Sequence, residues 1–316
     1  MNSRVVVLTG ASSGIGRAAA LAFAARGDRL VIAARGLGDL EKTAAKCGGS
    51  VLVVPTDVTD RTEVEALADA AVDVFGHIDV WADTAAVMAY GKFEDVPPDV
   101  FDKVVTTDLL GSANVAREAL RVFRRQGIGT LILCGSLLGH ITAPYMSAYV
   151  TSKWGLRGLA RTLRQETRDA PGINVCQLVP GSVNTPIYTS AANYAGFVGR
   201  PPPPVDSAER MGAGIVRLAD RPRRELSIGA ANRLAELGFK ALPPVYDALV
   251  GPMMGRLGLS RERVAPDTGN VFATAARHEG GPLRWGRLPV VALAATATVL
   301  ASSTVVAGVR RIRRGA

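Results

Sequence analysis

Short apolar runs that recur along the first 180 residues constrain the fold of this chain more than any other feature. The runs are VVVLT (5–9), RLVIAA (29–34), VLVV (51–54), IDVWA (78–82), GTLILC (129–134) and INVCQLV (173–179). They are rich in Val, Ile and Leu and do not alternate with polar residues, which is typical of strands buried on both faces. We expect a further strand at ELSIG (225–229).

Amphipathic stretches separate these runs. Four of them predict helices, over residues 14–26, 60–75, 99–125 and 147–169. Repeated alternation of strand and helix indicates a parallel, doubly wound sheet. The sequence therefore predicts an α/β, Rossmann-like fold of about seven strands, forming one domain over residues 1–250.

The character of the chain changes after Pro180. Residues 184–206 are loop-like and end in PPPP (201–204), which cannot continue a helix. This segment is either a lid over a pocket or a solvent loop. Residues 251–286 are rich in Gly, Pro and Arg, and we expect them to form a linker.

The segment 288–309 has 22 residues and no charge, within a carboxy-terminal part (287–316) that we expect to form a hydrophobic helix with a basic flank. As a helix it would span roughly 33 Å, enough for the hydrocarbon core of a bilayer. Its Ala- and Thr-rich composition leaves a surface helix as the alternative to a membrane span. Arginines on both sides leave its orientation weakly specified.

Net charge supports a membrane partner over a nucleic acid. Of the total of +9, the residues from Arg277 onward contribute +6, with seven arginines and one glutamate. The basicity is therefore mostly a property of the tail. Because the first strand begins near the amino terminus, with no secretory signal before it, we expect a cytoplasmic domain anchored to a membrane.

Cysteine and histidine positions give no indication of a metal. Cys47, Cys134 and Cys176 lie far apart, and no histidine clusters with them. We therefore expect free thiols in a reducing compartment and no metal site.

The stretch TGASSGIG (9–16) carries the first chemical signal. It joins a strand to a helix, and Gly10, Gly14 and Gly16 let the backbone approach a pyrophosphate at the start of that helix. At the end of the second strand the chain reads IAARG, so that Ala34 stands where an NAD site usually places an acid, and Arg35 follows it. An arginine there can pair with a 2′-phosphate, which favours NADP(H) over NAD(H).

The stretch AYVTSKWG (148–155) carries the second chemical signal. It sets Tyr149 four residues before Lys153, one turn apart on one helix face. An ammonium at that place favours the phenolate form of the tyrosine. To work near pH 7 the pKa of the hydroxyl must fall by about 3 units.

These motifs, together with Ser136 thirteen residues before Tyr149 and PGSVNTP (180–186), resemble the short-chain dehydrogenase/reductase family over about residues 4–230. The resemblance implies proton transfer by Tyr149, a substrate hydrogen bond from Ser136 and a cofactor-holding role for Lys153. It also implies an adenine contact at Asp57 and self-association through the two long helices. The implied cofactor-binding residues are Gly10, Ser12, Ser13, Gly14, Ile15, Gly16, Arg35, Asp57, Val58, Ala85, Tyr149, Lys153, Pro180, Gly181, Val183 and Thr185.

Two positions depart from the family pattern. Where the family usually reads Asn-Asn-Ala-Gly, this chain reads DTAA, with Asp83 first and Ala86 last. Asp108 stands in place of a family asparagine that supports a helix kink and a proton-delivering water chain. An ionised aspartate donates no hydrogen bond, so we expect Asp108 to belong to the catalytic set but to slow it.

Two functions remain open. The first is an NADP(H)-dependent oxidoreductase acting on a carbonyl or alcohol, with a lipophilic small-molecule substrate in keeping with the expected membrane anchor. The second is a catalytically weak or inactive member of the fold that serves as a membrane-tethered binding or scaffold protein. A serine hydrolase is excluded, because Cys134 precedes Ser136 where a nucleophile elbow needs glycine. The Arg- and Ala-rich composition is typical of a GC-rich bacterial genome.

Overall fold

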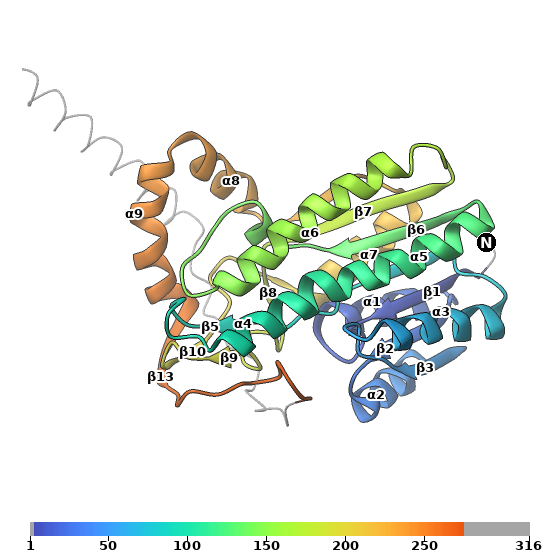
Figure 1. Cartoon of the computed structure of the whole chain (residues 1–316), viewed down its shortest axis with the longest axis horizontal. Coiled ribbons are helices and arrows are strands. Elements are labelled where there is room, and N and C mark those ends of the chain that lie inside the picture. The colour runs from blue at the N-terminus through green and yellow to red at the C-terminus, as the bar shows by residue number, and fades with distance from the viewer. Residues whose placement is uncertain (1–2, 275–316) are drawn as a thin grey trace, which may run out of the picture. The chain divides into compact units, whose positions relative to one another are not determined.

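The computed structural model describes residues 3–274 and builds them around one parallel sheet (Figure 1). Seven strands follow one another in the order β12-β7-β6-β4-β1-β2-β3. They are β1 (Val5–Thr9), β2 (Arg29–Ala34), β3 (Val51–Pro55), β4 (Val80–Asp83), β6 (Gly129–Cys134), β7 (Ile173–Pro180) and β12 (Glu225–Ile228). Every pairing in this sheet is parallel. The predicted Rossmann-like sheet is therefore confirmed.

Helices cover both faces of the sheet. On one face lie α1 (Gly14–Ala24), α2 (Leu37–Cys47) and α7 (Ala208–Asp220), and on the other α3 (Arg61–Phe75), α5 (Ser112–Gln126) and α6 (Ser147–Glu166). Neighbouring strand residues divide between the two faces. Val6 joins the cluster with α1 and α7, while Val7 joins the cluster with α3, α5 and α6. Both are fully buried, as their uninterrupted apolar runs predict.

The helix expected over 99–125 is interrupted. It consists of α4 (Pro98–Val105), a π-helical segment (Thr106–Gly111) and α5, with helical backbone angles at both junctions. A Cβ on Gly111 would lie 2.7 Å from the Val58 side chain, so glycine permits the helix to pass close there. Two of the other expected helices end earlier than predicted, α1 at Ala24 and α6 at Glu166.

Short strands interrupt the loop expected at 184–206. These are β8 (Ser182–Asn184), β9 (Ala192–Asn193), β10 (Phe197–Gly199) and β11 (Val205–Ser207), and two of them pair outside the segment, with β5 (Ala89–Tyr90) and β13 (Leu259–Arg263). The partners are far away in sequence, which is why local composition did not reveal them.

The first part of the segment predicted as a linker is folded. After α8 (Asn232–Ala241) and α9 (Pro243–Met253) come a π-helical turn (Met254–Gly258) and β13. Val271, further on, is completely buried. Residues 251–263 therefore carry secondary structure, and residues 275–286 of the expected linker lie outside the described residues.

Within residues 3–274, no helix is both long and apolar enough to cross a membrane. The span predicted at 288–309, and with it the helix expected over 287–316, lies outside the described residues.

Candidate active site

The turn between β1 and α1 is closed by glycines at places where a side chain would collide. Gly10 and Gly14 have φ angles of +76° and +52°. A Cβ on Gly10 would lie 2.6 Å from the Ala85 nitrogen, and one on Gly16 would lie 2.3 Å from the Gly10 oxygen. This close approach leaves backbone amides and the positive end of α1 together, with no side chain between them. The cradle fits the pyrophosphate of a dinucleotide.

The other residues predicted in this turn have distinct positions. Ser13 is the N-cap of α1, and its side chain makes no capping bond. The backbone carbonyl of Ser12 accepts a hydrogen bond from the Arg17 guanidinium. Ile15 packs partly buried against the core beneath α1.

The segment after β7 lies against this glycine turn. A Cβ on Gly14 would be 3.3 Å from the Thr185 side chain. Gly181 donates its N–H to the Ile228 carbonyl at 2.8 Å, which ties the end of β7 to β12. Pro180 ends β7, and Val183 in β8 is buried. The structure therefore brings the predicted residues of PGSVNTP next to the predicted pyrophosphate cradle.

Arg35 and Asp57 lie at the other end of the cradle, after β2 and β3. The Asp57 carboxylate accepts hydrogen bonds from the Thr59 N–H and hydroxyl, both at 2.9 Å, and lies 3.7 Å from the Lys103 ammonium. Burial raises its pKa, but these bonds and the charges of Lys103 and Arg35 outweigh burial and lower it. Val58 is buried beneath α5, where its carbonyl accepts from Asn114.

The first two turns of α6 carry the tyrosine and the lysine. The Lys153 ammonium lies 5.3 Å from the centre of the Tyr149 ring and donates to the Cys134 carbonyl at 3.2 Å. Ser136 follows β6, and its hydroxyl accepts from the Leu138 N–H at 3.1 Å. A Cβ on Gly139 would lie 2.7 Å from the Lys153 carbonyl, so the turn after Ser136 packs against α6. Ser136 thus lies at the carboxyl end of β6, and Tyr149 and Lys153 lie at the start of α6.

Burial dominates the electrostatics of the tyrosine. It raises the pKa of Tyr149, the positive charge of Lys153 lowers it, and the net shift is upward. The predicted influence of Lys153 therefore has the right sign, but it does not outweigh burial. Burial also disfavours the charged form of Lys153, yet the negative charges around it raise its pKa overall, with that of Asp108 among them. Lys153 is 2% exposed and remains an ammonium.

Asp83, at the end of β4, is held by several hydrogen bonds. Its carboxylate accepts from the hydroxyls of Thr9 and Ser112, each at 2.6 Å, and from the Ala85 N–H at 3.3 Å. Both oxygens thus have partners inside the core. The role of Ser112 was not predicted, because its partner is 29 residues away in sequence.

Asp108, in the π-helical segment, is less well satisfied. One oxygen accepts from the Val87 N–H at 2.8 Å. The other is buried without a hydrogen-bond partner and lies 3.7 Å from the Lys153 ammonium. Burial raises the pKa of this carboxyl to about 6, although Lys153 opposes the rise. Asp108 therefore lies within ion-pair distance of Lys153, the lysine predicted to hold the cofactor.

Ala86 does not strain the backbone. Among residues 3–274, Tyr145 is the one non-glycine residue with a positive φ angle, so the change from the family glycine costs no unfavourable conformation at Ala86.

Apolar side chains surround the tyrosine. Tyr149 belongs to a buried cluster that includes Tyr90 and Met254, and Ile187, Tyr188 and Phe197 from the expected lid pack against it. Tyr194, also from that segment, packs instead against a neighbouring cluster. The segment 184–206 therefore contributes part of the wall around the hydroxyl of Tyr149.

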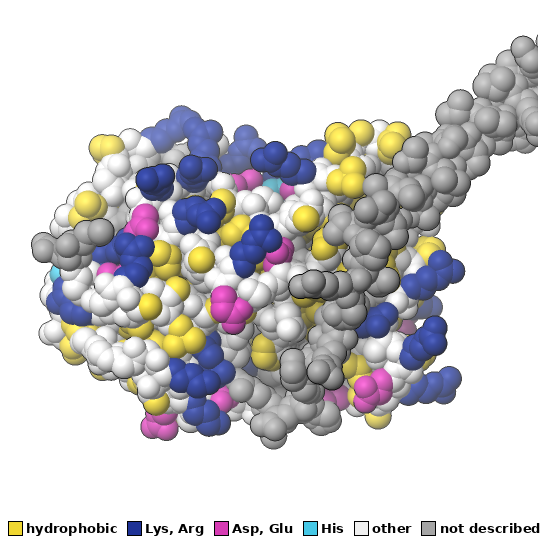
Figure 2. Space-filling model, turned by 180° about the vertical axis from the view of Figure 1, so that it is seen from behind, with side chains coloured by type: hydrophobic (Ala, Val, Ile, Leu, Met, Phe, Trp, Pro, Cys, Tyr) yellow, Lys and Arg dark blue, Asp and Glu magenta, His cyan; other side chains and the backbone are white. Residues whose placement is uncertain are grey.

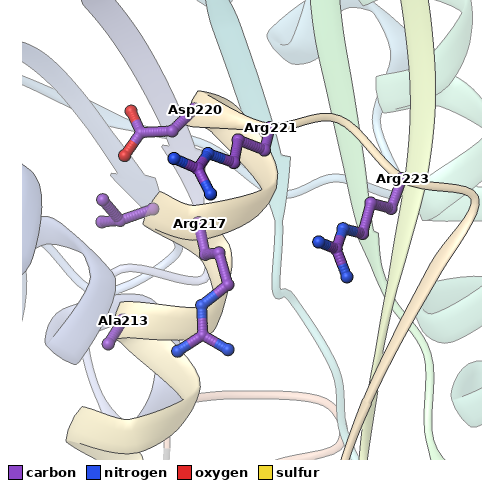
Figure 3. A pocket seen from close by; sticks show the side chains of 6 residues that line it. Ala213, Arg217, Asp220, Arg221 and Arg223 are labelled. Atoms are coloured by element: carbon purple, nitrogen blue, oxygen red, sulfur yellow. The ribbon is translucent and has the colours of Figure 1, made fainter.

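Other features of the described residues give little support for a second functional site. The part of the chain that the structure describes holds no group of three residues able to bind a metal ion. A shallow hollow at the end of α7, lined by Arg217, Arg221 and Arg223, lies beside Asp220 (Figure 3). Asp220 pairs with Arg4, just before β1, so this hollow is at the amino ends of the strands, across the sheet from Tyr149. Figure 2 shows basic side chains interspersed with acidic and apolar ones on the face seen from behind.

Comparisons with known proteins agree with this geometry. Residues 4–194 match a family model described as short chain dehydrogenase. An uncharacterized oxidoreductase of Bacillus subtilis is 30% identical over 265 residues, which cover 80% of this chain and 73% of the relative. A D-beta-hydroxybutyrate dehydrogenase of Rhizobium meliloti is 32% identical, over 58% of this chain and 73% of the relative.

Solved structures are also similar. An alcohol dehydrogenase from the archaeon Thermococcus sibiricus, in complex with 5-hydroxy-NADP, shares 27% identity with a TM-score of 0.63, over 72% of this chain and 96% of that one. Levodione reductase shares 25% identity with a TM-score of 0.65, over 73% of this chain and 98% of that one.

Proposed function

Because this chain belongs to the short-chain dehydrogenase family, whose members are oxidoreductases acting on alcohol and carbonyl groups, we propose that it transfers a hydride between NADP(H) and a lipophilic carbonyl or alcohol. One observation carries this proposal. Tyr149 and Lys153 lie one turn apart on α6, next to the turn that holds Ser136, and Tyr149 belongs to an apolar cluster.

The residues divide the chemistry among them. A bound nicotinamide supplies or accepts the hydride. Ser136 holds the substrate oxygen by a hydrogen bond, and the Tyr149 hydroxyl gives a proton to that oxygen in reduction or takes one in oxidation. Lys153 stabilises the phenolate by its charge, and the apolar side chains around Tyr149 exclude water from the reacting atoms.

The preference for NADP(H) rests on Arg35. Arg35 follows directly after β2, and the last residue of that strand, Ala34, is not an acid. Two of the Arg35 donors bind backbone carbonyls, and a guanidinium has five N–H groups, so donors remain for a phosphate. An arginine suits this role because its planar fork matches phosphate oxygens.

A membrane location would explain a lipophilic substrate. The uncharged segment 288–309 motivates this part of the proposal. Helices α8 and α9 add exposed apolar side chains, with Leu234, Leu237, Leu242, Val245 and Leu249 each about half exposed or more. Apolar side chains gathered on exposed helices are typical of an interaction surface. Recovery of the full chain from cells in the fraction that needs no detergent would contradict this location.

Self-association through α4–α5 and α6 is proposed from the family resemblance. Leu110, beside α5, is exposed by 53% and is available for such a contact. Light scattering during size-exclusion chromatography would measure the number of chains in the particle.

The alternative function is a catalytically weak scaffold. The unpartnered oxygen of Asp108 beside Lys153 favours it, because an ionised carboxylate there cannot donate a proton to a relay. The alternative keeps cofactor binding and gives up turnover.

The Tyr149→Phe substitution separates the two functions. We expect it to abolish NADPH-dependent reduction in a screen of apolar aldehydes and ketones, while NADPH binding measured by fluorescence titration stays within about threefold of the parent. Tyr246→Phe is the matched control. Tyr246 lies on the outer helix α9, and its hydroxyl donates a hydrogen bond to the Thr142 carbonyl. If the parent binds NADPH and turns over no substrate in the screen, the scaffold function is favoured.

A further inference from the structure

The chain crosses back to Arg35 near the end of the described residues. We call residues 267–274 the strap. The Arg35 guanidinium donates to the Asn270 carbonyl at 2.6 Å and to the Val271 carbonyl at 3.2 Å, across more than 230 positions of sequence. Thr274 lies beside Gly36, since a Cβ on Gly36 would be 3.1 Å from its methyl group.

Further backbone hydrogen bonds and a buried side chain hold the strap against the domain. Asp267 and Asn193 exchange backbone hydrogen bonds at 2.7 and 3.1 Å, and the Asn270 N–H donates to the Ser190 carbonyl at 2.9 Å. Val271 is completely buried in a cluster with residues of β5, α4 and α6. Gly269 turns the chain with a φ angle of +53°, where a Cβ would lie 2.4 Å from the Ser190 oxygen.

Asn270 links two segments that border the proposed cofactor site. Its N–H donates to the carbonyl of Ser190, five residues after the Thr185 that lies against the glycine turn, and its carbonyl accepts from Arg35, the proposed partner of the 2′-phosphate. The strap therefore connects the segment after the glycine-turn contact with the residue proposed to bind the adenosine phosphate.

Asn270 carries an unsatisfied acceptor. Its side-chain oxygen Oδ1 is buried and has no hydrogen-bond partner, which is costly for an amide in a protein interior. A group that brings a donor to this place would satisfy it. A ribose hydroxyl is such a donor, and the proposed cofactor brings ribose to the neighbourhood of Arg35.

We propose that the strap completes the cofactor site: its backbone carbonyls at 270 and 271 hold Arg35 in position for the 2′-phosphate, and Asn270 Oδ1 accepts a hydrogen bond from the adenosine ribose. This inference rests on the proposed NADP(H) function. Arg35 is fixed on one side by two carbonyls and keeps other N–H donors for phosphate, so holding it in place lowers the entropy lost on binding.

Binding measurements test the proposal without reference to turnover. The full chain and its variants are titrated with NADPH and with NADH, and the rate of NADPH release is measured by stopped-flow fluorescence. Gly269→Ala should unseat the strap, weaken NADPH binding about tenfold and speed its release, and weaken NADH binding only about threefold, through the loss of the Asn270 contact alone. Gly48→Ala is the matched control, since its φ angle is +60° with nothing within 4 Å of the added Cβ.

A double-mutant cycle shows whether the strap acts through Arg35. In the Arg35→Ala background, Gly269→Ala should weaken NADPH binding only about threefold, as much as Asn270→Ala does, because the arginine that the strap positions is gone. Asn270→Ala should weaken both cofactors about equally, since both have the ribose. Val271→Asp serves as a second way to unseat the strap if Gly269→Ala leaves hydrogen exchange at 267–274 unchanged.

The outcomes are distinguishable. If the parent binds neither cofactor, the proposed function fails. If the parent binds NADPH and a variant with an unseated strap binds and releases it like the parent, the function stands and the strap inference is wrong. Equal weakening of NADPH and NADH by Gly269→Ala, additive with Arg35→Ala, would also overturn it, because the strap would then contribute only packing.

Discussion

Two aspartates in the floor of the site stand where the family usually has asparagine, and the structure treats them in opposite ways. Asp83, at the end of β4, accepts three hydrogen bonds and has a partner for each oxygen. Asp108, in the π-helical segment, accepts one and leaves its second oxygen with only the Lys153 ammonium at 3.7 Å. Both are essentially fully buried. The same departure from a family pattern is therefore compensated by hydrogen bonds at Asp83, whereas at Asp108 one carboxylate oxygen remains without a hydrogen bond.

The difference shows that the partners of a residue decide its effect more than its type does. Thr9 and Ser112 offer hydroxyl donors to Asp83, so a carboxylate suits that place better than an amide. No side-chain donor other than Lys153 faces the second oxygen of Asp108, and burial disfavours its charge. Substitution of each aspartate by asparagine should thus have opposite effects.

The largest effect is expected in the pH dependence of Asp108→Asn. The folded-state pKa of Asp108 is about 6, above its ordinary value of 3.8. Well below pH 3.8 the carboxyl is protonated in both the folded and the unfolded chain and has no influence. Between about pH 3.8 and 6 the unfolded chain ionises it while the folded chain keeps it protonated, so the parent loses up to about 3 kcal/mol relative to the variant, and the loss is complete above about pH 6.

Urea unfolding of parent and Asp108→Asn at pH 4.5, 6 and 7.5 measures this difference. Parallel stability profiles across that range would show that the carboxyl does not titrate with a raised pKa.

Asp83→Asn should destabilise the chain by about 2 kcal/mol at pH 7.5. The amide nitrogen donates, so it cannot accept from Thr9 or Ser112, and one buried hydroxyl loses its acceptor. Urea unfolding beside Asp108→Asn at the same pH gives the comparison directly. If Asp108→Asn lowered the free energy of unfolding and Asp83→Asn did not, the roles that we assign to the two carboxylates would be reversed.

Ser112→Ala should cost about 1 kcal/mol, the usual net value of a hydrogen bond. In the Asp83→Asn background the cost should be smaller, because the bond between the two side chains is already weakened. Thermal unfolding of the two single variants and the double variant gives the coupling energy. Strict additivity would mean that Ser112 and Asp83 act separately.

The smallest effect concerns turnover. Asp108→Asn removes a negative charge that raises the pKa of both Tyr149 and Lys153. We expect kcat to rise about threefold and the pH profile of alcohol oxidation to shift to lower pH, since less negative charge favours the phenolate. A variant no faster than the parent on any substrate, with an unshifted profile, would contradict this.

Periodicity in the sequence was enough to predict the sheet and helix α6. The six apolar runs and ELSIG all became strands of one parallel sheet, because strands buried on both faces need continuous apolar residues. Tyr149 and Lys153 were placed by helical spacing alone, and Gly10 and Gly14 by the turn they must make. These features depend on residues near one another in the chain.

The rest of the fold depends on distant partners. β13 pairs with β10, some sixty residues earlier, and the strap meets Arg35 at the far end of the domain. Gly, Pro and Arg content at 251–274 is typical of a linker, yet Val271 is buried there by residues that no local pattern identifies. The bond from Ser112 to Asp83 was missed for the same reason.

The π-helical segment also sets the rotational phase of α5. Each residue of an α-helix turns the chain by about 100°, and a π turn accommodates one residue more than an α turn. Deleting a single residue between Thr106 and Gly111 would convert this turn to an ordinary α turn and leave the later side chains facing as they do now. If instead the segment folded as an α turn with all its residues kept, every later side chain would be rotated by about that angle. Val115, Ala119 and Val122, now buried against the sheet, would then turn away from it although none of them had been replaced. The π conformation of this segment is therefore as much a determinant of the core as the identity of the residues that follow it.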